Sequence, residues 1–346
     1  MGKNKSLIKD EGFFEDERCK SRKIIYLLFL LLMTGLLLST SSYAWFTTNR
    51  VVTLDTLNVK VQTEGSLEIS VDGINWKASI NQDEIISANA TYPMSINQIP
   101  NLIDPVSTAG GLNELGLLNM YLGKIISNSN GDYILTATKS EEKDSSGDEL
   151  EGKFIAFDIF LKVTDSKVLY LTGDSNITYN GDISVGTENA MRGAFIVEGN
   201  TLAGDNINNI QSLKTTNSNN VYIWEPNYDV HTSNGVNNAR DLYGITTSIM
   251  NASRISYDGV IAEINGEDNI VLSDANVNLY PDKFMTVVPK IVTSSDNSTY
   301  QELFVLNSGI TKLRIYFWLE GQDVDCENNA SVGDLSIVLK LSTNPA

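Results

Sequence analysis

Apolar and polar residues alternate with a period of two along much of this chain, which is the pattern of a β-strand that buries one face. The longest of these runs place an apolar residue at every second position of 57–61, 155–163, 313–319 and 335–341. Shorter strands are predicted at 67–71, 168–172, 193–198, 221–224, 259–264, 284–292 and 302–306. Strands with one polar face belong to antiparallel sheets in which that face meets water.

Turn residues between the strands support an all-β fold. Asp72-Gly73 separates the strand 67–71 from Ile74-Asn75-Trp76 and predicts a hairpin. Polar stretches at 139–152, 199–220 and 227–239 are predicted to be loops, the first of them a mobile surface loop. Strand-rich chains with frequent turns fold as sandwiches or jelly rolls. We therefore expect an antiparallel jelly-roll-like sandwich with long loop insertions.

Two segments carry more specific expectations. Residues 112–126 have apolar positions at helical spacing, but four glycines between 110 and 123 weaken that pattern. On the strand 313–319, the face opposite the apolar one is expected to point outward, and it carries Lys312, Arg314, Tyr316 and Trp318. Helical patterning is thus scarce, and residues 112–126 are the one helix candidate after residue 45.

The N-terminal region contains an apolar run with basic residues before it. Residues 24–38 are apolar except for Thr34 and Gly35, and Arg18, Lys20, Arg22 and Lys23 precede them. Ser42 and Ala44 occupy the −3 and −1 positions of a small-x-small cleavage site, which predicts cleavage before Trp45. An uncleaved anchor is the alternative, because about 20 apolar residues can span a bilayer.

Both interpretations divide the chain in the same way. Residues 1–23 form a cytoplasmic leader, residues 24–44 are a signal peptide or signal anchor that begins with a signal helix, and residues 45–346 form one extracellular β-sandwich domain. The expected location is therefore extracellular or at the cell surface.

The composition argues against several classes of function. The chain has 25 Lys and Arg against 43 Asp and Glu, a net charge of −18, so it lacks the basic face that a nucleic-acid partner requires. His231 is the single histidine, in a polar loop with no Gly-x-Ser-x-Gly sequence, and it is predicted to be solvated. Cys326 is the one cysteine after the junction, so no disulfide forms within the exported part. These features do not favour an enzyme.

An acidic turn near the C-terminus is the candidate for metal binding. Asp323, Asp325 and Glu327 supply oxygen ligands at alternate positions, as a calcium loop does. The segment lacks the central glycine and the distal glutamate of an EF-hand, so an acidic turn without metal is the alternative. Apart from calcium, no cofactor is predicted.

The segment around the junction resembles a known group of exported proteins. Tyr43-Ala44-Trp45-Phe46-Thr47, followed by the alternating strand 57–61, is similar to the alternate-signal proteins processed by SipW-type signal peptidases, the TasA- and camelysin-like surface proteins of Gram-positive bacteria. Further stretches that look like larger clostridial members of the group are 67–76, 191–192 with 223–227, and 316–326.

The resemblance implies a jelly-roll-like subunit of fibres or of the cell envelope. In TasA-like fibres the freed N-terminal segment pairs with the next subunit, which makes Leu57, Val59 and Val61 the candidate assembly strand here. Camelysin is classed as a metallopeptidase, but one histidine and no zinc-ligand pair do not support that activity for this chain.

Two functions follow from these patterns. The first is an exported bacterial cell-surface or matrix structural protein that assembles into fibres by strand addition. Its partners would be other copies or envelope proteins, with signal peptidase during export. The second is an extracellular carbohydrate- or calcium-binding module, based on outward Tyr316 and Trp318 beside the acidic turn. Electron microscopy for fibres distinguishes the two.

Overall fold

The chain divides into two compact units, Met1–Ala44 and Trp45–Ala346. The computed structural model describes residues 26, 52–61, 66–100, 102–108, 110–127, 133–140, 142, 153–181, 186–228, 230–233, 235, 237, 269–272, 290–293, 299–321, 323, 325–326 and 333–345. The predicted signal segment 24–44, apart from Tyr26, and the junction Ser42, Ala44 and Trp45 lie outside these residues. Within the described parts, no helix is long and apolar enough to cross a membrane.

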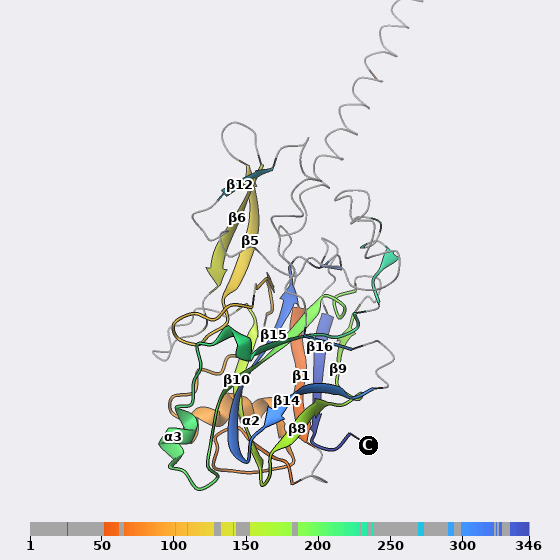
Figure 1. Cartoon of the computed structure of the whole chain (residues 1–346). Coiled ribbons are helices and arrows are strands. Elements are labelled where there is room, and N and C mark those ends of the chain that lie inside the picture. Colours follow the sequence, from red (N-terminus) through yellow and green to blue (C-terminus); the bar gives the residue numbers. More distant parts are fainter. Residues whose placement is uncertain are drawn as a thin grey trace, which may run out of the picture. The chain divides into compact units, whose positions relative to one another are not determined.

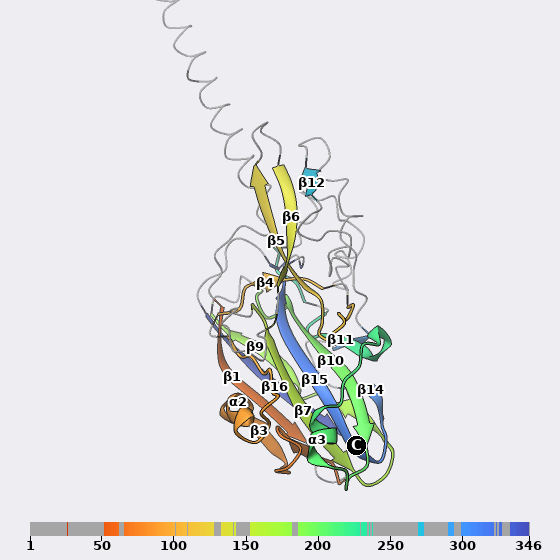
Figure 2. The same cartoon turned by 90° about the vertical axis from the view of Figure 1, so that its left-hand side faces the viewer.

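The second unit is mostly β-structure and contains two large sheets (Figures 1 and 2). The first sheet has the order β14 (Gln301–Leu306), β8 (Lys167–Leu171), β16 (Gly333–Ser342), β1 (Val52–Val61), β3 (Ser79–Asn81), and β9 (Asn176–Asn180) also pairs with β16. The second sheet has the order β13 (Ile291–Val292), β11 (Val221–Glu225), β10 (Met191–Thr201), β15 (Gly309–Glu320), β7 (Ile155–Val163), β2 (Glu68–Ser70), and β4 (Pro105–Val106) also pairs with β15.

A smaller sheet and short helices complete the described elements. The small sheet has the order β12 (Asn269–Leu272), β6 (Tyr133–Ser140), β5 (Met120–Ser127). The helices are α2 (Gln82–Ile86), η2 (Ser87–Ala90), α3 (Ile207–Gln211) and η4 (Ser218–Asn220). The N-cap residue of α2 is Asn81, whose side chain accepts from the backbone N–H of Glu84 while the Glu84 side chain accepts from the backbone N–H of Asn81.

Most strand pairs are antiparallel, as predicted, but three pairs among the described strands are parallel: β1 with β16, β11 with β13, and β4 with β15. The expectation of a purely antiparallel fold is wrong at these places. A parallel pair needs a long crossover between its strands. β1 and β16 satisfy this condition because they are the first and last strands described in the unit, with the rest of the fold between them.

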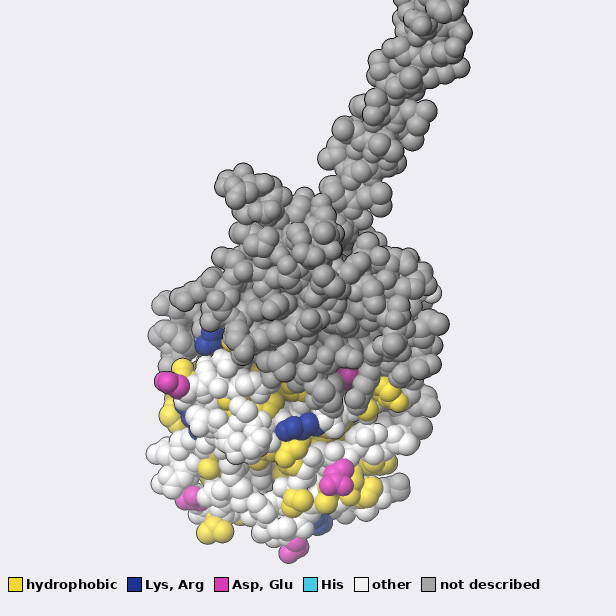
Figure 3. Space-filling model, turned by 45° about the horizontal axis from the view of Figure 1, so that its top comes forward, with side chains coloured by type: hydrophobic (Ala, Val, Ile, Leu, Met, Phe, Trp, Pro, Cys, Tyr) yellow, Lys and Arg dark blue, Asp and Glu magenta, His cyan; other side chains and the backbone are white. Residues whose placement is uncertain are grey.

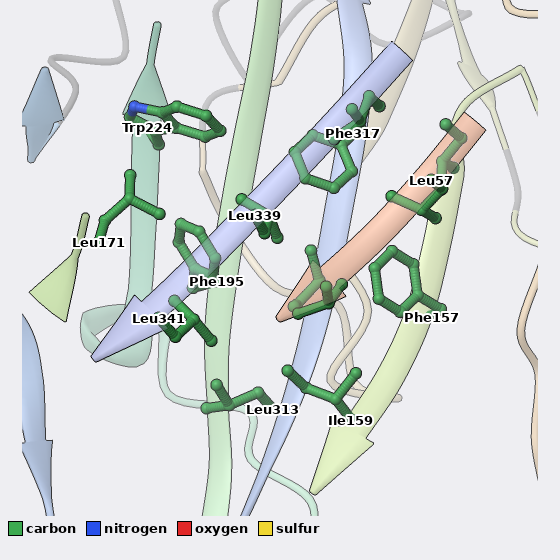
Figure 4. Close-up of a cluster of buried hydrophobic side chains, with 14 of the residues drawn as sticks. Leu57, Phe157, Ile159, Leu171, Phe195, Trp224, Leu313, Phe317, Leu339 and Leu341 are labelled. Carbon is green, nitrogen blue, oxygen red and sulfur yellow. The ribbon is translucent and has the colours of Figure 1, made fainter. Parts of the chain in front are cut away.

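The two large sheets pack face to face through the apolar sides of their strands, which is a sandwich arrangement (Figure 4). β1 and β16 contribute Leu57 and Leu339 from one sheet, and β7 and β15 contribute Phe157 and Phe317 from the other. The rings of Phe157 and Phe317 stack with their centroids 6.4 Å apart. The predicted apolar faces of 57–61, 155–163, 313–319 and 335–341 all lie in this core, so that prediction is confirmed.

β15 is buried on both faces, contrary to the prediction that Lys312, Arg314, Tyr316 and Trp318 point into water. Tyr316 is 0% exposed and Trp318 is 1% exposed. They pack in a second apolar cluster with Leu118 and Met120, and the Leu118 N–H donates to the Tyr316 hydroxyl at 3.2 Å. Segments distant in sequence therefore cover the outer face of this strand.

The helix predicted at 112–126 is wrong. Leu112 and Leu118 instead form an antiparallel bridge, and β5 begins two residues later. The side chain of Asn113 accepts from the N–H groups of Leu115 and Leu117 and closes the turn. Gly116 completes it at φ +75°, where a Cβ atom would lie 2.3 Å from a backbone oxygen. Gly116, one of the glycines that weakened the helical pattern, is thus required by the turn.

The hairpin predicted at Asp72-Gly73 is confirmed, with a wider loop than two residues. Ile69 and Lys77 exchange backbone hydrogen bonds of 3.0 and 2.9 Å at its base. The Asp72 carboxylate accepts from the N–H groups of Ile74 and Asn75, both at 2.8 Å. Burial by itself raises the pKa of Asp72, but these hydrogen bonds and those from the hydroxyls of Thr91 and Ser70 lower it by more, so the pKa of this carboxyl is well below its ordinary value.

Candidate functional site

Several charged side chains of the described residues are buried. On the face shown in Figure 3, the charged groups among the described residues are scattered singly between polar and apolar atoms. By contrast, Arg192 and Arg314 are both buried on the side of the second sheet that faces away from the main core. Each guanidinium gathers several carboxylates, and we refer to the two groups as the Arg192 cluster and the Arg314 cluster.

The Arg192 cluster begins with one guanidinium shared by two carboxylates. Nη2 of Arg192 lies 3.1 Å from Oε1 of Glu225 on β11 and 2.5 Å from Oδ2 of Asp323, which follows β15. Nη1 donates to the backbone oxygens of Asn189 and Met191. β10 lies between β11 and β15 in the sheet, and this order places Arg192 between the two carboxylates.

Asp325 joins three segments that are distant in sequence. Its Oδ1 accepts from the backbone N–H and the hydroxyl of Thr232, at 2.9 and 2.7 Å. Its Oδ2 accepts from Nδ2 of Asn189 at 3.1 Å and lies 3.1 Å from Nδ1 of His231. Gly186 allows the approach, because a Cβ atom there would lie 2.8 Å from Cγ of Asp325. The carboxylate therefore connects the turn before β10, the loop after β11 and the loop after β15.

His231 is buried, so the prediction of a solvated loop histidine is wrong. Its side chain is 3% exposed. Burial lowers its pKa, but the hydrogen bond to Asp325 and the charges of Asp323 and Asp325 raise it by more, so the net shift is upward. Its Nε2 has no hydrogen-bond partner within the described part of the chain.

The structure describes two of the three residues that the sequence predicts to bind calcium. Asp323 and Asp325 are both buried, and Glu327 lies outside the described residues. The structure adds His231, since ligand atoms of His231, Asp323 and Asp325 all lie within 4.8 Å of one another. His231 is 94 positions from Asp325, and nothing in the sequence between them signals the contact.

The Arg314 cluster joins the centre of the second sheet to surrounding segments. Nη1 of Arg314 lies 2.7 Å from Oδ1 of Asp158 on β7, and Nη2 pairs with Glu142. Nζ of Lys312 lies 2.6 Å from Oε2 of Glu198 and 3.3 Å from Oδ2 of Asp158. Glu142 lies within the predicted mobile loop 139–152, and its burial contradicts that prediction for this residue.

The candidate assembly residues lie in the sandwich core. Leu57, Val59 and Val61 are all buried on the inner face of β1. One edge of β1 pairs with β16 from Val52 to Val61, and the other pairs with β3 from Asn58 to Lys60. The segment that the sequence suggests for pairing with a neighbour is therefore an interior strand of its own sheet.

The described residues thus contain two buried charge clusters and an enclosed first strand, and similarity to known proteins adds nothing to this picture. Comparisons with protein-family models, with curated proteins and with solved structures give no match for this chain.

Proposed function

We propose that this chain is an exported, non-enzymatic structural protein of the bacterial cell surface or extracellular matrix, a jelly-roll-like subunit that assembles into fibres by exchanging strand β1 between copies. The proposal rests on one observation. Strand β1, the first described strand of the second unit, pairs with a neighbour on each side and buries its apolar face in the core.

Removing β1 from its sheet would destabilise the fold, whereas replacing it with β1 of another copy would not. Its inner face carries Leu57, Val59 and Val61, and burying each side chain of this size stabilises the fold by roughly 1.5–3 kcal/mol. A second copy can supply the same strand to the same position with the same contacts. Exchange of an identical element therefore has a low free-energy cost and is favoured by high protein concentration.

The position of β1 in the chain also supports this proposal. It follows the predicted cleavage junction at Trp45 by a few residues, so cleavage would free the chain end that precedes it. The slot that it fills lies between β16 and β3, where backbone groups on both sides serve as a template for an incoming strand.

A cysteine-pair experiment tests the exchange. Lys60 and Lys340 are register partners on β1 and β16, where adjacent strands lie about 4.8 Å apart, within the range of a disulfide. We would introduce Lys60→Cys and Lys340→Cys after replacing Cys19 and Cys326. If β1 is exchanged, oxidation of the assembled protein gives covalent dimers and ladders on a non-reducing gel.

The matched control is the pair Thr178→Cys and Ser336→Cys, which are register partners on β9 and β16. These strands stay in one subunit whether or not β1 is exchanged, so this pair should give only monomers. A Lys60/Lys340 pair that closes only within monomers, at every concentration that gives fibres in the parent protein, would contradict the proposal. So would the absence of fibres by electron microscopy.

The alternative function, a carbohydrate-binding module, loses its main support. It depended on outward Tyr316 and Trp318, and both side chains are buried under other segments. The indole N–H of Trp318 donates to Glu320 at 2.9 Å, so its polar group is also occupied within the chain.

A further inference from the structure

The contact between His231 and Asp325 brings together two atoms that can each bind a cation. Nδ1 of a neutral imidazole and Oδ2 of a carboxylate can each present a lone pair, and here they are 3.1 Å apart. A proton on Nδ1 makes this contact a hydrogen bond. A metal ion that both atoms ligate can take the place of that proton.

The distances also suit a metal ion. Metal–ligand bonds of about 2.1 Å, as for zinc with nitrogen and oxygen ligands, place two ligands of one ion roughly 3.0–3.4 Å apart. The His231–Asp325 separation falls in this range, and a ligand atom of Asp323 lies within 4.8 Å of both. Three ligands thus come from two loops that the folded sheet holds together.

The surroundings resemble the outer shell of a metal site. Ligating carboxylates in such sites are themselves hydrogen-bonded, which fixes their orientation. Here Thr232 and Asn189 donate to Asp325, and Arg192 donates to Asp323. These donors hold both carboxylates in place without an ion.

Glu188 provides an independent observation beside these ligands. One oxygen of its carboxylate, Oε2, is buried and receives no hydrogen bond within the described residues. Glu188 directly precedes Asn189, whose Nδ2 donates to Asp325, so it belongs to the turn that borders the ligands. Asp323 and Glu225 share the single guanidinium of Arg192, so the carboxylates around His231 outnumber the cations.

We propose that His231, Asp323 and Asp325 form a binding site for a divalent transition-metal ion of the zinc type. Imidazole and carboxylate together suit zinc and its neighbours, whereas calcium takes six to eight oxygen ligands. The proposal differs from the calcium loop expected from the sequence in its ion and in its third ligand, His231 in place of Glu327. It is independent of whether β1 is exchanged.

The test uses the full chain, prepared without a histidine tag and stripped of metal with a chelator. We expect Zn²⁺ to bind with one ion per chain in titration calorimetry. At a free concentration of about 100 times the dissociation constant, it should raise the melting temperature by about 5 °C. Millimolar Ca²⁺ should leave the melting temperature unchanged.

His231→Gln is the informative variant, because the glutamine amide can still donate to Asp325 and preserve the connection between the loops. This variant should lose both the calorimetric binding and the melting-temperature increase. Asp174→Asn, which changes an exposed carboxylate, is the matched control and should retain both.

A measurement on the unaltered protein covers the case in which His231→Gln does not fold. The chain has one histidine, so an imidazole ligand seen by zinc X-ray absorption assigns His231 directly. No stoichiometric zinc binding, a site without imidazole, or wild-type binding by a folded His231→Gln variant would each overturn the proposal. The contact would then be a hydrogen bond from Nδ1–H of His231 to Asp325.

Discussion

Glu198 shows how single residues in this fold respond to the charges around them. Together with Asp158 and Glu142 it is one of three buried carboxyl groups that face two cations, Lys312 and Arg314. Burial raises the pKa of Glu198 to about 7, and the nearby charge of Asp158 adds to the increase, while Lys312 opposes it. The carboxyl group of Glu198 therefore stays protonated in the folded state at pH values at which an exposed glutamate would be ionised.

This pKa predicts how stability depends on pH. The folded state binds the proton up to about pH 7, whereas the unfolded carboxyl releases it near its ordinary pKa of 4.5. The unfolded state then binds fewer protons in this window, so the free energy of unfolding falls as pH rises through it. The decrease attributable to Glu198 should be on the order of 3 kcal/mol between about pH 5 and pH 8.

Urea unfolding of the wild type and of Glu198→Gln across this pH range measures the effect. The variant should lose most of the decrease, because glutamine does not titrate. Glu302→Gln, on an edge strand and exposed, should keep the wild-type pH dependence. An identical slope in the wild type and Glu198→Gln would contradict the assignment.

At the scale of the elements, β1 and β15 illustrate two different relations between pattern and burial. β1 alternates apolar and polar residues and buries only its apolar face, as the pattern indicates. β15 has an alternating pattern too, yet every one of its residues is buried. The difference arises because Leu118, Met120 and the buried ion pairs cover the second face of β15, whereas the polar face of β1 stays partly exposed.

Removing packing from β1 should cost more stability than removing the same atoms from a surface turn. Leu57→Ala deletes a side chain that is 1% exposed, and such changes typically destabilise by about 2–5 kcal/mol. Leu202→Ala deletes one that is 77% exposed and should change stability by less than about 0.5 kcal/mol. Denaturant unfolding of the monomer compares the two, and equal effects would show that β1 does not occupy its place in the core.

At the scale of the whole molecule, the chain separates into the units Met1–Ala44 and Trp45–Ala346. The expected cleavage before Trp45 would release the second unit, because Ser42 and Ala44 complete a small-x-small site. N-terminal sequencing of protein from the culture medium should then begin at Trp45 or within a few residues of it. Recovery of the protein only in membranes, with residues 1–44 intact, would instead establish the anchor.

The sequence by itself determined the four long core strands and the apolar face that each turns to the core, whereas the predicted strand 259–264 lies outside the described residues. Side chains alternate across a strand with a period of two, so a local pattern such as that of 155–163 or 335–341 is enough to identify both. The hairpin at Asp72-Gly73 was also predictable from local sequence, because a turn depends on adjacent residues.

Only the tertiary structure decided what lies on the second face of each strand and which charged groups meet. The order of strands in a sheet brings together segments far apart in the chain, and no periodicity records that order. His231 and Asp325 meet because the loops after β11 and β15 lie at the same end of neighbouring parts of one sheet. Arg192, Arg314 and Tyr316 are likewise buried because distant segments cover them. Their local sequence pattern, which alternates polar and apolar residues, would equally fit a strand face that meets water.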